Sequence, residues 1–233
     1  AMVSAQAALK DQSTAKSLLC DSEDYLLEAL QFLQPAEPKL IAVGGLSGTG
    51  KSTLSTKLAP EFGDVPGAFL LRSDLERKKM LGAEEFERLP PEAYNEIANR
   101  HVYERIFDKA RIALMQGQTV ILDAVFAEAE HRQRAAEIAS KLKVPFCGLW
   151  LDAPPDTLVE RVRIRRHDAS DADVEVVRKQ LTRDVGFDQD AYDHWMEVDA
   201  SGSPNDTKRH AELQIRDVFQ SAEQGFAAAR SDH

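Results

Sequence analysis

The chain alternates short apolar runs with longer stretches in which apolar residues recur roughly every three or four positions. Continuous runs predict buried strands, and the wider spacing predicts helices. The runs fall at residues 40–43, 68–72, 119–122 and 145–151, with a weaker one at 195–198. Helical spacing covers residues 12–33, 51–58, 97–115, 128–142 and 156–166. Strands that alternate with helices predict an α/β fold, with a five-stranded, mostly parallel sheet between two helical layers.

Prolines mark the start of the last helix and the boundary between the N-terminal extension and the α/β domain. Ser203-Pro204-Asn205-Asp206 is a capping-box sequence with proline at the first helical position, so the final helix is expected to open there. Pro35 and Pro38 interrupt the chain just before the first strand. We therefore expect residues 1–35 to form an N-terminal helical extension and residues 36–233 to form one α/β domain.

Charge and cysteine content exclude some classes of protein. The formal net charge of −10 disfavours broad binding to nucleic acid, which needs a basic surface. Cys20 and Cys147 are too few for a disulfide framework or a zinc site, and a reducing cytoplasm fits them. Cys147 lies in an apolar run and is expected to be a small buried hydrophobe. No membrane span and no signal peptide are expected from the apolar pattern.

The segment from Gly45 to Ser52 matches the Walker A pattern of phosphate-binding loops, directly after an apolar run and before a helical one. Glycines let backbone N–H groups approach phosphates, and the following helix points its positive end at the same anion. Lys51 is expected to reach the β- and γ-phosphates, and Ser52 to bind Mg²⁺. The alternative is a glycine-rich turn without a ligand, whereas Thr53 stands where a dinucleotide loop needs glycine. The predicted binding residues for ATP are Gly45, Ser47, Gly48, Thr49, Gly50, Lys51, Ser52 and Thr53.

Two acidic residues follow predicted strands and are candidates for the reaction centre. Asp74 could orient a substrate hydroxyl that attacks the γ-phosphate, or it could cap a helix that starts at Leu75. Asp123 could bind a water of Mg²⁺ as a Walker B aspartate, contact the substrate, or cap the following segment. Arg72 and Arg77 flank Asp74 and are candidate substrate contacts, although Arg77 could equally be a solvated surface charge.

Four arginines lie within residues 161–166 and create a strong local positive field. Arg161 and Arg165 are four apart, so on a continuous helix they would share a face and could clamp phosphates together. The sequence 170–173 resembles a capping box that opens another helix. Residues 161–173 are therefore predicted to form a short helical lid. The alternative is that these arginines are solvated and only stabilise the C-terminus of the helix that carries them.

The base is predicted to be adenine, because the guanine-reading Asn-Lys-x-Asp motif is absent from the sequence. The segment Ser201-Gly202-Ser203, just after the fifth predicted strand, is a plausible contact for this base.

With these residues collected, the sequence resembles small P-loop kinases of the adenylate-kinase superfamily, over roughly residues 36–228. It is similar to predicted kinases described as AAA-family ATPases, which often follow an aminoglycoside-phosphotransferase-like domain. The matching stretches are residues 43–53, 71–74, 120–126 (VILDAVF), 148–154 (GLWLDAP) and 166–171 (RHDASD). This likeness implies a fused upstream domain, of which the helix at residues 12–33 would be a remnant.

The resemblance also implies roles for individual residues. Asp74 and Arg77 are similar to the Asp and Arg, three apart, with which polynucleotide kinases activate a 5′-hydroxyl. Zeta-toxin and chloramphenicol phosphotransferase kinases place an acid at the same strand end. Arg161 and Arg165 resemble the paired lid arginines of nucleotide kinases. No acceptor-binding pattern is matched, so the candidates there are polar residues of the usual acceptor region, namely Tyr94, Asn99, Arg100 and Tyr103.

The function expected from these patterns is ATP-dependent transfer of a phosphoryl group to a hydroxyl of a small molecule, catalysed by Lys51, Asp74, Arg161 and Arg165 with Mg²⁺. One alternative is a 5′-hydroxyl polynucleotide kinase, supported by a possible basic groove near residues 72–79. A second is a regulatory ATP-binding module of a two-domain protein. A third is a toxin-like kinase that acts on nucleotide-sugar precursors.

Overall fold

The computed structural model describes residues 15–33, 37–165, 168–182, 187 and 194–231. The chain divides into two compact units, Ala1–Ala36 and Glu37–His233. The first contributes helix α2 (Ala15–Leu33), so the helix expected at residues 12–33 is confirmed over its described part. Its leucines Leu19, Leu26 and Leu30 are about half exposed, at 50%, 54% and 47%. That this unit is the remnant of another domain stays a prediction.

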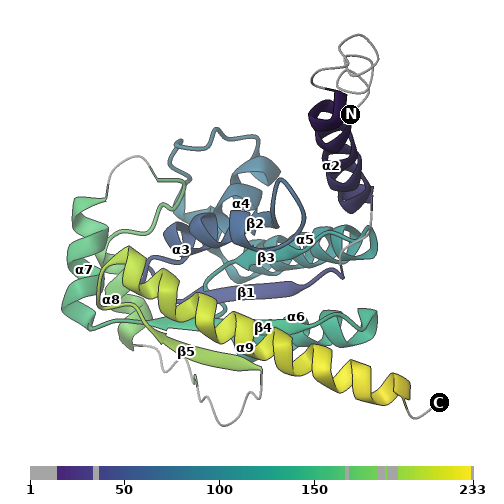
Figure 1. The fold of residues 1–233 in the computed structure, drawn as a ribbon. Coiled ribbons are helices and arrows are strands. Elements are labelled where there is room, and N and C mark those ends of the chain that lie inside the picture. Colours follow the sequence, from purple (N-terminus) through teal and green to yellow (C-terminus); the bar gives the residue numbers. More distant parts are fainter. Residues whose placement is uncertain (1–14, 34–36, 166–167, 183–186, 188–193, 232–233) are drawn as a thin grey trace. The chain divides into compact units, whose positions relative to one another are not determined.

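The second unit is built on a five-stranded sheet in the order β2-β3-β1-β4-β5, shown in Figure 1. Every strand pairing is parallel, so the mostly parallel sheet expected from the sequence is confirmed. The strands are β1 (Leu40–Gly45), β2 (Phe69–Arg72), β3 (Val120–Asp123), β4 (Phe146–Asp152) and β5 (Trp195–Asp199). All five lie within one or two residues of the apolar runs that predicted them.

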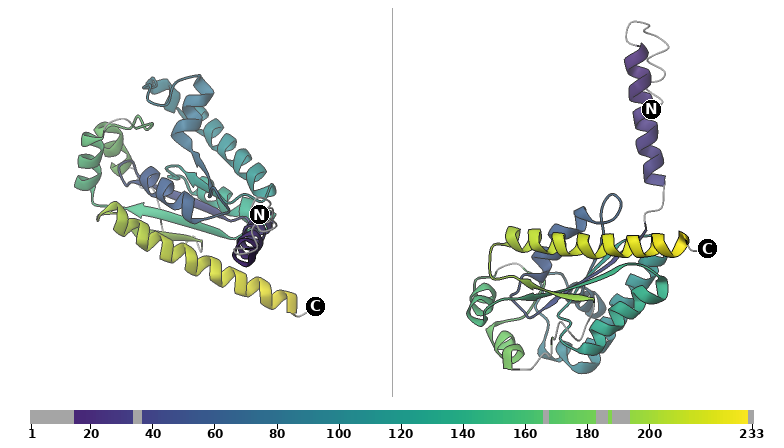
Figure 2. Two further views of the ribbon diagram at one scale, coloured as in Figure 1. Left: turned by 45° about the horizontal axis from the view of Figure 1, so that its top comes forward. Right: turned by 60° about the horizontal axis from the view of Figure 1, so that its bottom comes forward.

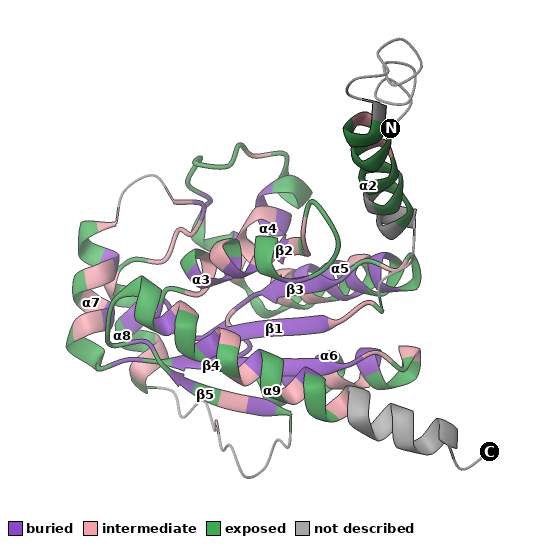
Figure 3. Cartoon of the chain, viewed as in Figure 1, coloured by how far each residue is buried: buried purple, intermediate pink, exposed green. Residues whose placement is uncertain are grey.

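Helices cover both faces of the sheet, because β1 points alternate side chains into two separate cores. Leu40 and Ala42 pack with α5 and α6, whereas Ile41 and Val43 pack with α3, α7, α8 and α9. Figure 3 shows the strands as the buried centre of this three-layer unit. The helices are α3 (Lys51–Leu58), α4 (Ser73–Leu81), α5 (Glu96–Met115), α6 (Ala129–Leu142), α7 (Pro155–Ile164), α8 (Val174–Thr182) and α9 (Pro204–Ser231), with short 3₁₀ turns η1 (Ala59–Glu61) and η2 (Pro91–Tyr94).

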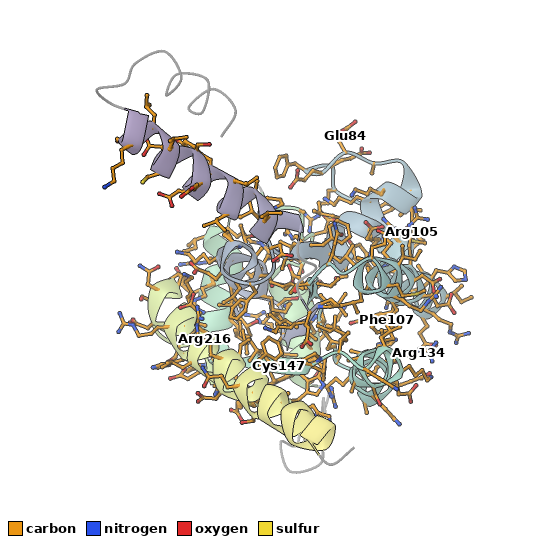
Figure 4. The ribbon with its side chains drawn as sticks, turned by 45° about the vertical axis from the view of Figure 1, so that its right-hand side comes forward. Glu84, Arg105, Phe107, Arg134, Cys147 and Arg216 are labelled. Carbon is orange, nitrogen blue, oxygen red and sulfur yellow. The ribbon has the colours of Figure 1, made fainter. Side chains whose placement is uncertain are left out.

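The edge strand β5 carries a large indole that only small neighbours accommodate. A Cβ on Gly148 would lie 2.3 Å from the Trp195 ring, and one on Gly44 would lie 3.0 Å from it. On the other face Cys147 is fully buried, and burial raises the pKa of its thiol to about 12. Figure 4 places Cys147 in the interior of the unit, so the expectation that it is a buried hydrophobe is confirmed.

The last helix begins as its sequence predicts. Pro204 is the first residue of α9, and the Asp206 N–H donates to the Ser203 hydroxyl at 3.3 Å. Helix α9, yellow in Figure 2, then runs along the sheet and packs through Ala211, Ile215 and Phe219. Within the described part of the chain, no helix is long and apolar enough to span a bilayer.

Because all five strands are parallel, their carboxyl ends meet at one edge of the sheet. The strands end there at Gly45, Arg72, Asp123, Asp152 and Asp199. In open α/β sheets ligands bind beyond this edge, near the strand at which the connections change direction. That strand is β1, because the chain passes to β2 and β3 on one side of it and to β4 and β5 on the other. The loop that follows β1 is therefore the first place to look for a site.

Candidate functional site

The loop after β1 takes a conformation that its glycines permit. Gly45, Gly48 and Gly50 have φ angles of 131°, 92° and 93°, in the region that favours glycine. A Cβ would lie 2.5 Å from the Leu151 carbonyl oxygen at Gly45, and 2.7 Å from the Leu158 carbonyl oxygen at Gly48. A Cβ on Gly50 would meet nothing within 4 Å, so here the backbone angle alone requires glycine. The first two glycines let the loop pack, and the third lets it turn into α3.

Two side chains of the loop bind its own backbone. The Leu46 carbonyl oxygen accepts hydrogen bonds from the Thr49 hydroxyl at 2.8 Å and from Lys51 Nζ at 2.9 Å. Helix α3 starts at Lys51, and no side chain caps the N–H groups of its first turn. Free N–H groups at a helix start carry partial positive charge and attract anions. The loop therefore presents a lysine and a helix N-terminus at the same edge of the sheet.

The charges around Lys51 come from four separate segments. Burial lowers the pKa of Lys51, while Asp123 and Asp74 raise it. Arg165 also lowers this pKa, and Asp168 raises it, so the segment after α7 reaches the same centre. The structure thus brings together β3, the start of α4, the phosphate-loop lysine and the predicted lid.

The side chains of Asp123 and Ser52 lie together near Lys51. The Ser52 hydroxyl donates to the Asp123 carboxylate, and Arg72 Nε lies 3.3 Å from Asp123 Oδ2. Burial raises the pKa of Asp123, and this effect outweighs the opposing effects of Lys51, Ser52 and Arg72, which lower the pKa. A hydroxyl and a carboxylate fit Mg²⁺, which takes few protein ligands and completes its shell with phosphates and water. Asp123 does not cap α6, which starts only at Ala129.

Asp74 does not cap a helix either. Helix α4 begins at Ser73, its N-cap position is Arg72, and no side chain makes a capping bond there. Within the described residues Asp74 makes no hydrogen bond or ion pair, yet it lies close enough to raise the pKa of both Lys51 and Arg77. A carboxylate in this state is open to a ligand hydroxyl.

The arginines near Asp74 are engaged by the protein itself. Arg72 is paired with Asp123 and with Asp168, each at 3.3 Å. Arg77 is 7% exposed, so the alternative of a solvated surface charge is wrong. Its Nη1 donates to the Ala93 carbonyl oxygen and its Nη2 to Asn99 Oδ1, both at 2.7 Å. It therefore ties α4 to the segment that leads into α5.

The candidates from the acceptor region lie in different surroundings. Arg100 is exposed on α5, and no described residue forms an ion pair with it. Tyr94 and Asn99 instead bind other parts of the protein. The hydroxyl of Tyr103 accepts a hydrogen bond from the Phe126 N–H at 2.8 Å. A role of Arg100 in binding the acceptor stays a prediction.

The basic groove expected near residues 72–79 is not formed. Lys78 is 1% exposed, and its Nζ donates to the carbonyl oxygens of Glu85 and Glu87, both at 2.8 Å. Lys79 points outward and pairs with Glu76, which also binds Arg105 and Lys109 of α5. Arg105 lies on the outer side of α5 in Figure 4. Because Lys78 is buried and Lys79 is paired, these lysines do not line a surface groove.

The prediction that Arg161 and Arg165 share a helix face is wrong. Helix α7 ends at Ile164, and Arg165 is already extended, with φ −60° and ψ 135°. Arg165 Nη2 donates to the Ser170 and Ala172 carbonyl oxygens at 3.1 and 2.6 Å, within the lid segment. Residues 166 and 167, also assigned to the lid, lie outside the described residues.

Arg161 instead binds the backbone of the loop after β5. Its guanidinium donates to the carbonyl oxygens of Ala200, Ser201 and Gly202 at 2.8, 3.3 and 3.0 Å. The two arginines thus hold two different loops at the edge of the site. A catalytic role for either one stays a prediction.

The lid segment is joined to the region after α4 by Asp171. Its carboxylate accepts hydrogen bonds from the Tyr94 hydroxyl at 2.6 Å, the Leu89 N–H at 3.0 Å and Lys78 Nζ at 3.3 Å. Asp171 therefore does not belong to a capping box. Helix α8 starts at Val174, and Asp173 caps it by accepting the Val176 N–H at 3.0 Å. We call Asp171, Lys78, Tyr94 and Leu89 the Asp171 cluster.

Removing the Asp171 carboxylate is expected to destabilise the fold, because it leaves the buried Lys78 ammonium without its counter-charge. Asp171→Ala should lower the free energy of unfolding by about 3–5 kcal/mol in urea denaturation. Burial raises the pKa of Asp171, but the hydrogen bonds that its carboxylate accepts lower this pKa by more. The pKa of Asp171 is therefore below the usual aspartate value of 3.8. Its contribution is therefore present at neutral pH and lost as pH falls through the lowered pKa, where variant and parent should converge.

A suitable control for this prediction is Glu160→Ala, which breaks an exposed pair with Arg163. It should change stability by less than about 1 kcal/mol. An Asp171→Ala protein as stable as the control would contradict the assignment.

One contact to the glycine-rich loop could not be predicted from the order of residues along the chain. The Ser47 N–H donates to Gln180 Oε1 of α8 at 2.8 Å. Asp168, which pairs with Arg72, was also not singled out as a site residue. Gln180 lies in no recognised motif and Asp168 lies in the matching stretch 166–171, but only the packing of the segment after α7 brings Gln180 to Ser47 and Asp168 to Arg72.

A cleft of about 370 Å³ lies beside Ser52 and Arg72. It is lined by Ser52, Thr53, Thr56, Lys57, Arg72, Glu85, Phe86, Asp168 and Ala169. Its walls come from the first turns of α3, from the end of β2, from the loop after α4 and from the lid. The cleft thus joins the start of α3, at Ser52, to Arg72 and to Asp168 of the predicted lid.

Comparison with known families agrees with this geometry. A family model described as an AAA domain matches residues 40–184, which is more than half of the chain. The chain belongs to the AAA domain family. The match runs from β1, through the phosphate loop and the lid, to just beyond α8. This AAA domain thus includes most of the site residues, while Ala200–Gly202 lie beyond the matched range.

Solved structures share the fold of this AAA domain. A gluconokinase from Sinorhizobium meliloti 1021 superposes with a TM-score of 0.58 at 18% identity, over 81% of this chain and 98% of that one. A sugar kinase from Janibacter sp. HTCC2649 gives a TM-score of 0.59 at 16% identity, over 79% and 98%. The APS kinase CysC of Mycobacterium tuberculosis, in complex with AMPPNP and APS, gives 0.52 at 17% identity, over 78% and 99%. At these identities the likeness establishes the fold, which is that of P-loop kinases.

Among curated sequences, the AAA domain is similar to Uncharacterized protein Rv2004c of Mycobacterium tuberculosis and to Uncharacterized protein Mb2027c of Mycobacterium bovis. Each is 28% identical over 172 residues, which cover 72% of this chain and 34% of the relative. The chain thus spans about a third of the length of these relatives.

Proposed function

We propose that this domain is an ATP-dependent kinase that transfers a phosphoryl group to a hydroxyl of a small molecule. One observation carries the proposal, namely the convergence of Lys51, the Ser52–Asp123 pair and Asp74, which has no partner among the described residues, at the end of the phosphate loop. The printed names of the solved structures of the same fold, a gluconokinase, a sugar kinase and an APS kinase, support transfer to a small molecule.

Each group has a proposed role. The amides of the loop and of the first turn of α3 would hold the phosphates, and Lys51 would leave the Leu46 carbonyl oxygen to bind them. Ser52 and Asp123 would hold Mg²⁺, directly and through water. When bound, Mg²⁺ would neutralise charge on the phosphates. Asp74 would accept or orient the proton of the attacking hydroxyl, as a general base placed within hydrogen-bond reach.

Arg165 and Arg161 would both contact the nucleotide. Arg165 acts on the pKa of Lys51, so its charge reaches the place where phosphate charge would accumulate. Arg161 lies against the loop 200–202, where its guanidinium would stack on an adenine base. We propose adenine rather than guanine because the guanine-reading Asn-Lys-x-Asp motif is absent from the sequence.

A polynucleotide kinase is less well supported by the surface near Asp74. Lys78 is buried and Lys79 is paired with Glu76, so these lysines do not line a track for a nucleic-acid backbone. A regulatory module of a larger protein remains the alternative, because the chain spans about a third of its curated relatives. An upstream kinase-like domain as the partner is part of that alternative.

The proposal is tested with the purified chain, Mg-ATP and a library of small hydroxyl compounds. ADP formation that depends on one acceptor, with a product heavier by one phosphoryl group in mass analysis, supports it. Binding of Mg-AMPPNP without transfer to any compound would instead favour the regulatory module. If Mg-AMPPNP does not bind at all, both readings are wrong.

Gln180 offers a test of the phosphate loop itself. Gln180→Glu keeps an acceptor for the Ser47 N–H but adds a negative charge beside the proposed triphosphate site. We expect Mg-AMPPNP to bind about tenfold more weakly in calorimetry, because like charges at an interface repel. Gln180→Ala, which removes the hydrogen bond without adding charge, is the matched control and should bind more tightly than Gln180→Glu. Equal affinities of the two variants would place the triphosphate elsewhere.

A further inference from the structure

The charge of the acceptor is restricted by how Arg77 is held. In polar sites an anionic ligand is commonly bound by an arginine fork, which needs two open N–H groups on one side of the guanidinium. Arg77 donates through Nη1 to Ala93 and through Nη2 to Asn99, and it lies 4.7 Å above the Tyr94 ring centroid. Its Nε is sealed from solvent and has no hydrogen-bond partner. No open fork is therefore left on this side chain.

The neighbouring cations are held in the same way. Arg72 lies between the carboxylates of Asp123 and Asp168, each at 3.3 Å. Lys78 is surrounded by two carbonyl oxygens and by Asp171. In the described segment from the end of β2 to Lys78, each of these positive charges thus faces protein oxygens. An acceptor with its own negative charge would find no free cation in this segment, whereas Arg100 on α5 is exposed and has no ion pair to a described residue.

Asp74 stands in contrast, since it has no hydrogen bond or ion pair to a described residue. A carboxylate or phosphate on the acceptor would be repelled by this charge at short range, whereas a hydroxyl would donate to it. Tyr103 adds a group of the opposite kind. Its hydroxyl accepts the Phe126 N–H at 2.8 Å, and no described residue accepts its own proton. The Asp74 carboxylate can accept a hydrogen bond from one hydroxyl, and the Tyr103 phenol, whose pKa both Arg77 and Asp74 shift, can donate one to a neighbouring hydroxyl.

We propose that the acceptor is an uncharged polyhydroxylated molecule, such as a sugar or a sugar alcohol, and not a compound with a carboxylate or phosphate. The proposal rests on the proposed kinase function and narrows its substrate class. One hydroxyl of the acceptor donates to Asp74 and attacks the γ-phosphorus of ATP. Its proton passes to the Asp74 carboxylate, the bond from the γ-phosphorus to the bridging oxygen breaks, and ADP leaves with that electron pair. A second hydroxyl accepts the Tyr103 proton in a hydrogen bond.

The experiment compares matched pairs that differ only in charge. Alditols with four to six carbons and the aldonic acids of the same length are offered to the full chain with Mg-ATP, and ADP and product mass are measured. We expect kcat/KM for the best alditol or sugar to exceed that of its acid by at least about tenfold, because like charges repel. Equal or better use of the acids overturns the proposal, and so does the absence of transfer to every uncharged compound.

Tyr103→Phe provides a second readout on the acceptor alone. The KM for the uncharged acceptor is expected to rise about tenfold, as for the loss of one good hydrogen bond, with the Kd of Mg-AMPPNP unchanged. An unchanged KM for the acceptor overturns the assignment of the second hydroxyl. Thermal melting of the variant shows that it is folded. The Kd of Mg-AMPPNP separates the proposed kinase function from the proposed acceptor class. Lost Mg-AMPPNP binding in the parent chain refutes the kinase function, whereas retained binding with transfer only to acids refutes the acceptor class alone.

Discussion

Lys51→Ala is expected to lower kcat/KM by about 10³-fold. The charges of Asp123, Asp74, Arg165 and Asp168 all act on the pKa of Lys51, which lies where the loop turns into α3. Its ammonium is partly desolvated, since burial lowers its pKa, so its interaction with a phosphate would be weakly screened. Alanine removes that charge without filling the space. ADP formation under saturating acceptor is the measurement.

A surface lysine separates this effect from a general change of charge. Lys141 lies on α6 and makes only an exposed pair with Glu137, at 3.4 Å. Lys141→Ala removes the same charge and should leave kcat/KM within about twofold of the parent, because exposed pairs contribute little. Calorimetry with Mg-AMPPNP gives the second measurement, in which Lys51→Ala alone loses affinity. If the two variants behave alike, the phosphate loop does not bind the nucleotide.

Asp74→Asn is expected to lower kcat by about 10²–10⁴-fold while nucleotide affinity stays close to that of the parent. The amide keeps the size of the side chain but cannot accept a proton from the attacking hydroxyl. Stability should hardly fall, because within the described residues Asp74 makes no hydrogen bond or ion pair and caps no helix. The measurements are kcat with the best acceptor, Kd for Mg-AMPPNP, and the urea midpoint.

Asp108→Asn is the control for this change, since Asp108 is exposed on α5. It should alter none of the three quantities. Unaltered turnover in Asp74→Asn would remove Asp74 as the base and leave positioning by the loop, the metal and the arginines as the source of catalysis. A lower nucleotide affinity with normal kcat would instead place Asp74 at the nucleotide.

The two arginines of the lid illustrate what a linear pattern misses. A spacing of four residues predicts a shared face only while the helix continues, and α7 ends between them at Ile164. Arg161 then points to the loop after β5, and Arg165 turns back to the lid carbonyl oxygens. The same limit explains Asp171, because a capping-box pattern cannot reveal that Lys78 and Tyr94 arrive from another segment.

Local rules determined the elements and the phosphate loop. Apolar runs fixed the five strands to within one or two residues, because a strand buried on both faces must be apolar throughout. The loop from Gly45 to Ser52 could be predicted because each glycine answers a backbone angle or a close contact of its own. Asp74 and Asp123 could be selected because parallel strands bring their carboxyl ends to one edge.

Tertiary structure decided which of these groups are free to act. Burial and pairing take Arg77 and Lys78 away from the surface and leave Asp74 without a described partner, and nothing in their order along the chain distinguishes them. The contact from Gln180 to Ser47 joins residues 133 apart, so only packing creates it. The sequence by itself determined the conformation of the glycine-rich loop, because a local conformation needs only neighbouring residues. The availability of each charge depends on desolvation and on partners from distant segments, and so it was decided by the fold.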